Sequence, residues 1–170
     1  MSTKWNLDPS HSELTFRVKH MMIANLTGKI GSFEVEAESD DEQLTNAKVK
    51  VVANMSSIST GDEKRDGHLM SPDFFDVANF PAMTFQSRKM ENGKLEGDLT
   101  IRDVTRPVVL DVEFGGNGKD PWGNTRAGIT VAGKINRKDW NLLWNMPLDT
   151  GGVIVSDEVR INGEVELVKS

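Results

Sequence analysis

The stretch ELTFRVKH, residues 13–20, decides the fold class of this chain. Leu14, Phe16 and Val18 alternate with polar residues, and successive side chains of a β-strand point to opposite faces of the sheet. The stretch therefore predicts a strand with one apolar and one polar face, as in antiparallel sheets that pack a single face against a core.

The same alternation returns seven more times, and glycine-containing turns at 91–93, 115–118 and 150–152 separate the later strands. Eight one-faced strands with little helix predict an all-β fold, either a sandwich or a closed barrel, and we expect an eight-stranded antiparallel β-barrel. A barrel of this size either fills with side chains or holds one small ligand. The apolar positions of the further strands are Phe33, Val35 and Ala37; Ala47, Val49, Val51, Ala53 and Met55; Met83 and Phe85; Leu95, Leu99 and Ile101; Val108, Leu110, Val112 and Phe114; Ala127, Ile129 and Val131; and Val159, Ile161, Val165 and Leu167.

Residues 61–78 break the alternation. Within them, Ser71-Pro72-Asp73 predicts a helix start, because proline suits the first helical position and an acidic residue complements the positive end of the helix dipole. We expect a short helix from Pro72 to Ala78 that covers one end of the barrel, with Phe74, Phe75 and Phe80 as its apolar contacts.

Length and composition set limits on function. The 170 residues predict a single domain, 1–170, large enough for a sizeable core or an internal cavity. The net charge is −6 and no cluster of Lys and Arg is present, which argues against nucleic-acid binding. The acidic stretch 34–42 is interpreted as the solvated face of a strand and its turn, with an interaction patch as the alternative. Because the chain has no cysteine, it can form neither a disulfide nor a thiolate site.

The ends and the apolar stretches of the chain bear on location. No apolar run precedes Trp5, so we expect no signal peptide and a cytoplasmic protein, or a periplasmic one if a leader was removed. No stretch approaches eighteen apolar residues, so we expect no membrane-spanning segment.

The residues that could carry chemistry do not form a known catalytic pattern. The spacing of His11, His20 and His68 matches no local metal motif. Asp8, His11 and Ser12 are crowded into one turn, where they cannot align as orienter, base and nucleophile. We therefore expect no enzyme activity, no metal and no cofactor. Two alternatives stay open: a small hydrolase or isomerase that uses His20 or His68 at the barrel mouth, and a solid-cored barrel that binds only other proteins.

Several segments, in their order and spacing, resemble the YceI family of polyisoprenoid-binding, lipocalin-like barrels. The resemblance runs from Trp5 to Val168 and includes an Arg-x-Asp-aromatic-Gly motif in which Asn141 replaces the usual glycine. Asparagine tolerates positive φ better than most residues, so we expect the turn to survive. The segments are Trp5–His20, Ser57–Gly61, His68-Leu69, Asp73–Asp76, Phe80–Phe85, Gly97–Ile101 and Arg137–Trp140.

The resemblance implies the binding, for storage or transport, of a long-chain isoprenoid or similar amphiphilic lipid inside a lipocalin-like barrel. The partner is then that lipid, and a homodimer is kept open. The inward faces and the resemblance together predict the ligand-binding residues: Phe16, Val18, His20, Phe33, Val49, Val51, Phe85, Leu99, Ile101, Leu110, Val112, Ile129, Val131 and Trp140.

Overall fold

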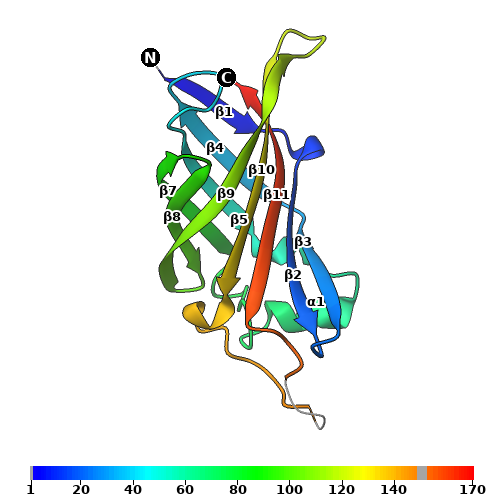
Figure 1. Cartoon of the computed structure of the whole chain (residues 1–170). Helices are drawn as coiled ribbons and strands as arrows, with labels where there is room; N and C mark the ends of the chain where they lie inside the picture. The colour runs from blue at the N-terminus through cyan, green and yellow to red at the C-terminus, as the bar shows by residue number, and fades with distance from the viewer. Residues whose placement is uncertain (1, 149–152) are drawn as a thin grey trace.

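The fold is a closed antiparallel barrel, described by a computed structural model for residues 2–148 and 153–170 (Figure 1). The turn predicted at 150–152 lies outside these residues. The described strands are β1 (Thr3–Leu7), β2 (Glu13–His20), β3 (Ala24–Ile30), β4 (Phe33–Ser39), β5 (Lys48–Asn54), β6 (Ile58–Ser59), β7 (Ala82–Glu91), β8 (Lys94–Ile101), β9 (Val104–Lys119), β10 (Thr125–Asn136) and β11 (Glu158–Lys169).

Eight strands close the ring, in the order β1-β4-β5-β7-β8-β9-β10-β11, with β1 pairing back to β11. Strand β2 continues the wall beyond β1, since it pairs with the first half of β11, where Phe16 lies opposite Ile161. Strand β3 pairs with β2 in the same way that β4 pairs with β1. The predicted eight-stranded antiparallel barrel is therefore confirmed. At two of its eight positions the barrel is built by two strands that are consecutive in the chain, β1 with β2 and β3 with β4.

Three of the described strands were not predicted: β1, β3 and the two-residue β6. Strand β3 carries Gly28 in the middle of its inward face, where an apolar side chain would have marked the alternation. A Cβ on Gly28 would collide with the phenyl ring of Phe16, which crosses over from the paired strand β2. The ring of Phe16 thus fills the place of the missing side chain, and this hides the strand from a periodicity argument.

The outward faces are polar and paired by charge. Glu36 lies opposite Lys50 and Glu38 lies opposite Lys48 on the neighbouring strands β4 and β5, an arrangement that favours the observed register. Glu34, Glu36 and Glu38 are all exposed. The acidic stretch is thus the solvated face of β4.

The one α-helix of the described residues lies at one barrel end, as predicted, but the predicted position in the chain was wrong. Helix α1 spans Glu63–Met70, and Asp62 caps it by accepting hydrogen bonds from the backbone N–H groups of Lys64 and Arg65. The predicted helix, Pro72–Ala78, is instead a series of turns in which Asp76 has a φ of 46°. The backbone N–H groups of Phe75 and Val77 instead donate to the oxygens of Leu69 and Met70 at the end of α1, both at 2.9 Å, so they form no helix of their own. No helix of the described chain is long and apolar enough to cross a membrane.

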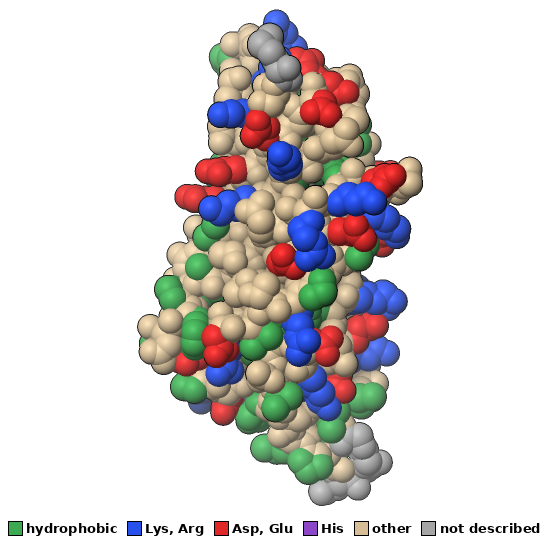
Figure 2. Space-filling model, turned by 90° about the vertical axis from the view of Figure 1, so that its left-hand side faces the viewer, with side chains coloured by type: hydrophobic (Ala, Val, Ile, Leu, Met, Phe, Trp, Pro, Cys, Tyr) green, Lys and Arg blue, Asp and Glu red, His purple; other side chains and the backbone are tan. Residues whose placement is uncertain are grey.

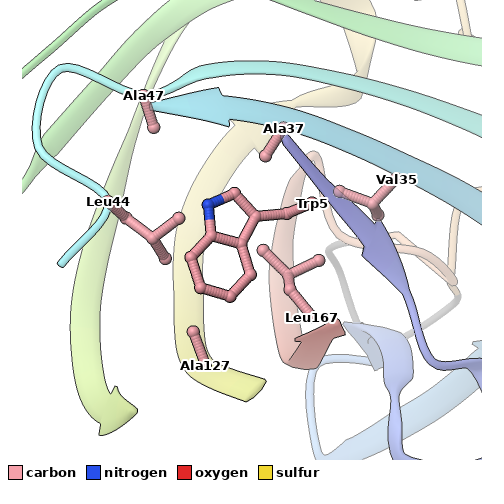
Figure 3. Close-up of a cluster of buried hydrophobic side chains, with 7 residues drawn as sticks. All are labelled: Trp5, Val35, Ala37, Leu44, Ala47, Ala127 and Leu167. Carbon is pink, nitrogen blue, oxygen red and sulfur yellow. The ribbon is translucent and has the colours of Figure 1, made fainter. Parts of the chain in front are cut away.

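The end of the barrel opposite α1 is filled by Trp5 (Figure 3). Its indole is 1% exposed and is surrounded by Val35, Ala37, Leu44, Ala47, Ala127 and Leu167. The indole Nε1 donates to Ser39 Oγ at 3.0 Å, so the one polar atom of the ring is satisfied. This packing closes one end of the barrel and leaves the α1 end as the place for an opening.

Candidate ligand-binding cavity

An apolar cavity of about 240 Å³ lies at the α1 end of the barrel. Its walls come from β2, β3, the ends of β10 and β11, helix α1 with the turns after it, and four residues from the loop between β10 and β11, namely Leu142, Trp144, Ile154 and Val155. Its apolar lining is Leu14, Phe16, Val18, Leu26, Ile30, Met55, Ile58, Leu69, Phe74, Phe75, Met83, Ile101, Ile135, Leu142, Trp144, Ile154, Val155, Val159 and Ile161.

A second apolar cavity, of about 120 Å³, continues deeper into the barrel toward the Trp5 end. Leu14, Met83 and Ile161 line both cavities and form the wall between them. The described interior is therefore not uniformly filled but holds two apolar cavities that have lining residues in common.

Thirteen of the fourteen predicted residues line one of the two cavities; their contact with a ligand stays a prediction. Those of the outer cavity are Phe16, Val18, His20 and Ile101. Those of the inner cavity are Phe33, Val49, Val51, Phe85, Leu99, Leu110, Val112, Ile129 and Val131. The remaining one, Trp140, lines neither cavity. It is 2% exposed beneath the barrel, and its Nε1 donates to the backbone oxygen of Leu99 at 2.9 Å.

Sequence reasoning missed the residues that form the mouth. Leu142, Trp144, Ile154 and Val155 lie in a segment without regular secondary structure, so no periodicity marks them. The one usable signal is the Arg137 motif that precedes this segment. There Asn141 has the expected left-handed conformation, with a φ of 61°.

Arg137 holds the mouth segment in place. Its side chain is almost fully buried, and Nε donates to the backbone oxygen of Ser156 at 2.9 Å. Nη1 donates to the backbone oxygens of Leu142 at 2.6 Å and Trp144 at 2.9 Å. Burial lowers the pKa of Arg137, and the charge of Asp157 partly opposes this. A guanidinium remains protonated in such a site. Arg137 can therefore connect the backbone at Leu142 and Trp144 to the backbone at Ser156.

Two further polar side chains around the outer cavity, those of Arg65 and His68, have partners within the protein. Arg65 donates through Nε to Thr60 Oγ1 at 2.7 Å. His68 lies 2.9 Å from Asp73 Oδ2 through Nε2, and its ring meets those of Phe74 and Trp144 edge to face. Arg65, His68 and Arg137 thus lie around an apolar space and already have partners within the protein.

The third histidine lies at the opposite end. His11 Nδ1 is 2.8 Å from Asp8 Oδ2, and this hydrogen bond raises the pKa of His11. Ser12 Oγ donates to the backbone oxygen of Asp8, not to the His11 ring. The three residues therefore do not form a triad, as the crowding of the turn predicted.

Asp8, His11 and Glu166 are the one group of metal-type ligands that converges among the described residues. Arg126 Nη1 lies 2.5 Å from Asp8 Oδ2 and 3.0 Å from Glu166 Oε2, so a cation already compensates both carboxylates. We interpret the group as an ion-pair network, and the absence of a metal stays a prediction.

The sequence of the described barrel matches a known family. The model of the YceI-like domain matches residues 5–167. The chain belongs to the YceI-like family. A UPF0312 protein of Staphylococcus aureus is 36% identical over 165 residues, which cover 96% of each chain. No catalytic activity is assigned in the names of these YceI-like relatives.

Solved structures of YceI-like proteins share the fold. A Campylobacter jejuni YceI protein superposes with a TM-score of 0.75 at 31% identity, covering 89% of this chain and 90% of its own. Burkholderia cenocepacia BcnA superposes with a TM-score of 0.80 at 22% identity, covering 94% and 98%. A domain from Saccharophagus degradans, described as polyisoprenoid-binding, has a TM-score of 0.69 at 14% identity, covering 98% of each chain. The last two likenesses show the fold alone.

Proposed function

We propose that this YceI-like protein binds a long-chain isoprenoid, or a similar amphiphilic lipid, inside its barrel and acts without catalysis. The observation that carries the proposal is the pair of apolar cavities that share Leu14, Met83 and Ile161 as a common wall. The polyisoprenoid-binding description of the Saccharophagus degradans domain supports the choice of ligand class.

The size and lining of the cavities suit a hydrocarbon chain. An apolar cavity of about 150 Å³ is large enough to bind benzene, and the outer cavity alone measures about 240 Å³. Each methylene that leaves water contributes roughly 0.8 kcal/mol. Met83 in the shared wall and Met55 beside it have flexible thioether side chains that adapt to irregular ligands, so a longer chain can join the two spaces.

The polar groups at the mouth favour binding by the tail. Arg65, Arg137 and His68 already donate to, or lie in hydrogen-bond contact with, partners within the protein. A headgroup would have to displace these partners to bind them. We therefore infer that the apolar chain supplies most of the affinity.

Uptake of tritiated geranylgeraniol by the purified protein tests the proposal. Ile161→Trp places a large side chain in the wall shared by both cavities and should reduce uptake at least tenfold, because the ring occupies space that the chain needs. Phe85→Asp and Leu99→Asp should abolish uptake, because each places an uncompensated carboxylate on the inner lining. Glu36→Ala, on the exposed face of β4, is the control and should bind normally.

Circular dichroism must show that each variant is folded. Undiminished uptake by a folded Ile161→Trp protein and a folded Leu99→Asp protein would rule out binding in the barrel. Absence of uptake by the unmodified protein, together with no lipid in its organic extract by mass spectrometry, would favour the protein-binding alternative.

A further inference from the structure

Apolar side chains are exposed around the mouth of the outer cavity. Met21, Met22 and Ile23 form the turn between β2 and β3 and are 41%, 52% and 82% exposed. Leu143 and Met146, on the segment after η3 (Arg137–Trp140), are 59% and 53% exposed. We call these five residues the mouth patch. Figure 2 shows hydrophobic side chains gathered at this lower end of the molecule.

The two parts of the mouth patch are joined through the cavity wall. The backbone N–H of Met21 donates to the oxygen of Ile154 at 2.8 Å, and the N–H of Ile154 donates to the oxygen of Met146 at 3.0 Å. Ile154 itself lines the outer cavity. The patch and the cavity are therefore two sides of the same hydrogen-bonded segment.

The conformation of the β2–β3 turn is unfavourable for the residues it contains. Met21 and Met22 have φ values of 53° and 64°, and the N–H of Ile23 donates to the oxygen of His20 at 3.2 Å. Two successive residues with positive φ in a hairpin turn strongly favour asparagine and glycine. Two methionines occupy these positions instead, and three consecutive exposed apolar residues are a design error unless they serve a function.

Charged residues are absent from the stretches that carry the mouth patch. Residues 21–28 and 141–148 contain no Asp, Glu, Lys or Arg, in a chain of which these residues make up 27%. A surface that enters the apolar part of a bilayer must avoid charges, because burying an unpaired charge is costly. The depletion therefore fits a lipid surface better than a polar protein surface.

The shape of the patch argues against a second copy of the chain as its occupant. A stable protein interface buries about 800 Å² on each partner, contributed by some 20–30 residues. The mouth patch consists of five side chains carried by a turn and a short segment. Such narrow projections are too small for a stable dimer, whereas a few inserted side chains can attach a protein to a bilayer.

We propose that the mouth patch inserts into the surface of a lipid bilayer and thereby connects the outer cavity to the pool of its ligand. The proposal rests on the proposed lipid-binding function, since it is the route by which that lipid enters and leaves. The bilayer needs no particular anionic headgroup, because the contact is apolar and the protein has a net charge of −6.

Flotation with phosphatidylcholine vesicles tests the docking step. The unmodified protein should float with the vesicles, and Ile23→Glu and Leu143→Glu should each lower its partitioning at least tenfold. The control is Val109→Glu, which changes an apolar residue on strand β9 that is 54% exposed, close to the 59% of Leu143. It should float as the unmodified protein does.

A second measurement separates docking from lipid binding. Uptake of farnesol from solution, without vesicles, should be unchanged in Ile23→Glu, while transfer of geranylgeraniol from vesicles should slow at least tenfold. If the unmodified protein fails to float, or if Ile23→Glu and Val109→Glu float equally, membrane docking is wrong. A dimer in light scattering that Ile23→Glu converts to a monomer, without flotation, would assign the patch to a second copy and also overturn it. Flotation without farnesol uptake would leave docking in place and contradict the lipid-binding function.

Discussion

Arg126 Nη1 lies 2.5 Å from Asp8 Oδ2, although the two residues are 118 positions apart in the chain. The same guanidinium contacts Asp120 Oδ2 through Nε at 2.8 Å and Glu166 Oε2 through Nη1 at 3.0 Å. Arg126 is on β10 and Glu166 on β11, whereas Asp8 is at the corner between β1 and β2. The network thus connects β10, β11 and the corner between β1 and β2, at the end of the barrel that Trp5 closes.

This network should make the protein less stable in acid. The hydrogen bond from Arg126 lowers the pKa of Asp120 from 3.8 to about 2, and bonds from His11, Ser10 and Arg126 lower the pKa of Asp8 further. A carboxylate with a lowered pKa in the folded state stabilises the protein above its unfolded pKa. That contribution disappears as the pH falls from about 4 toward 2.

The Asp120→Asn substitution tests this dependence. The free energy of unfolding, measured in urea by circular dichroism, should fall less steeply between pH 4 and pH 2 in the variant than in the unmodified protein. Asp103→Asn, at an exposed turn position, is the control and should keep the original slope. Identical slopes in all three proteins would show that Asp120 does not contribute to acid stability.

Trp140 should act in stability rather than in ligand binding. Trp140→Phe removes the hydrogen bond from Nε1 to the oxygen of Leu99 and leaves space beneath the barrel. We expect a loss of about 1–3 kcal/mol, with a melting temperature lower by roughly 2–4 °C per kcal/mol. Lipid uptake should be unchanged. Trp122→Phe makes the same replacement at an 80% exposed site and should melt normally. Weakened uptake without a loss of stability in Trp140→Phe would instead restore its predicted contact with ligand.

The contact between the Phe85 ring on β7 and Gly97 on β8, which lies diagonally across the strand pair, should be intolerant of a side chain on the glycine. A Cβ on Gly97 would lie 2.5 Å from the backbone oxygen of Gln86 and 2.6 Å from Phe85 Cζ, so Gly97→Val must displace both the β7 backbone and the ring that lines the inner cavity. We expect a loss of about 1–3 kcal/mol from such overpacking. Gly118→Val, on β9 with no neighbouring atom near its added Cβ, should change stability by less than about 0.5 kcal/mol. Chemical denaturation of both variants measures the difference, and equal stabilities would contradict the close packing of Phe85 on Gly97.

The inward faces of the barrel could be predicted because period-two alternation is a local property of the chain. Leu95, Leu99 and Ile101 mark the buried face of β8 without any knowledge of their neighbours. Strand β3 was not predicted because the ring of Phe16, on the neighbouring strand, fills the space at Gly28 where an apolar side chain of β3 would otherwise lie. Trp140 lines neither cavity, because a residue that follows a strand can turn beneath the barrel instead of into it, and alternation within the strand does not reveal this.

The mouth could not be predicted because long-range contacts determine it. Leu142, Trp144 and Ser156 are placed by the hydrogen bonds that their backbone oxygens accept from Arg137, and no local propensity encodes these contacts. Helix α1 was missed because Asp62 caps a charged segment that contains Gly67 and few apolar residues. Capping chemistry alone, rather than amphipathic periodicity, would have located it.

Ligand affinity should rise with chain length and respond little to salt. The two cavities are apolar, and the charged groups at the mouth are engaged with other groups of the protein, so each added isoprene unit should gain affinity until the space is full. Isothermal titration with farnesol, geranylgeraniol and longer prenols, in low salt and in high salt, measures both dependences. An ion pair with a headgroup would instead weaken as salt screens it. Affinity that changes strongly with salt but not with chain length would mean that the headgroup is recognised. The contacts that Arg65 and Arg137 make within the protein would then have to break when the ligand binds.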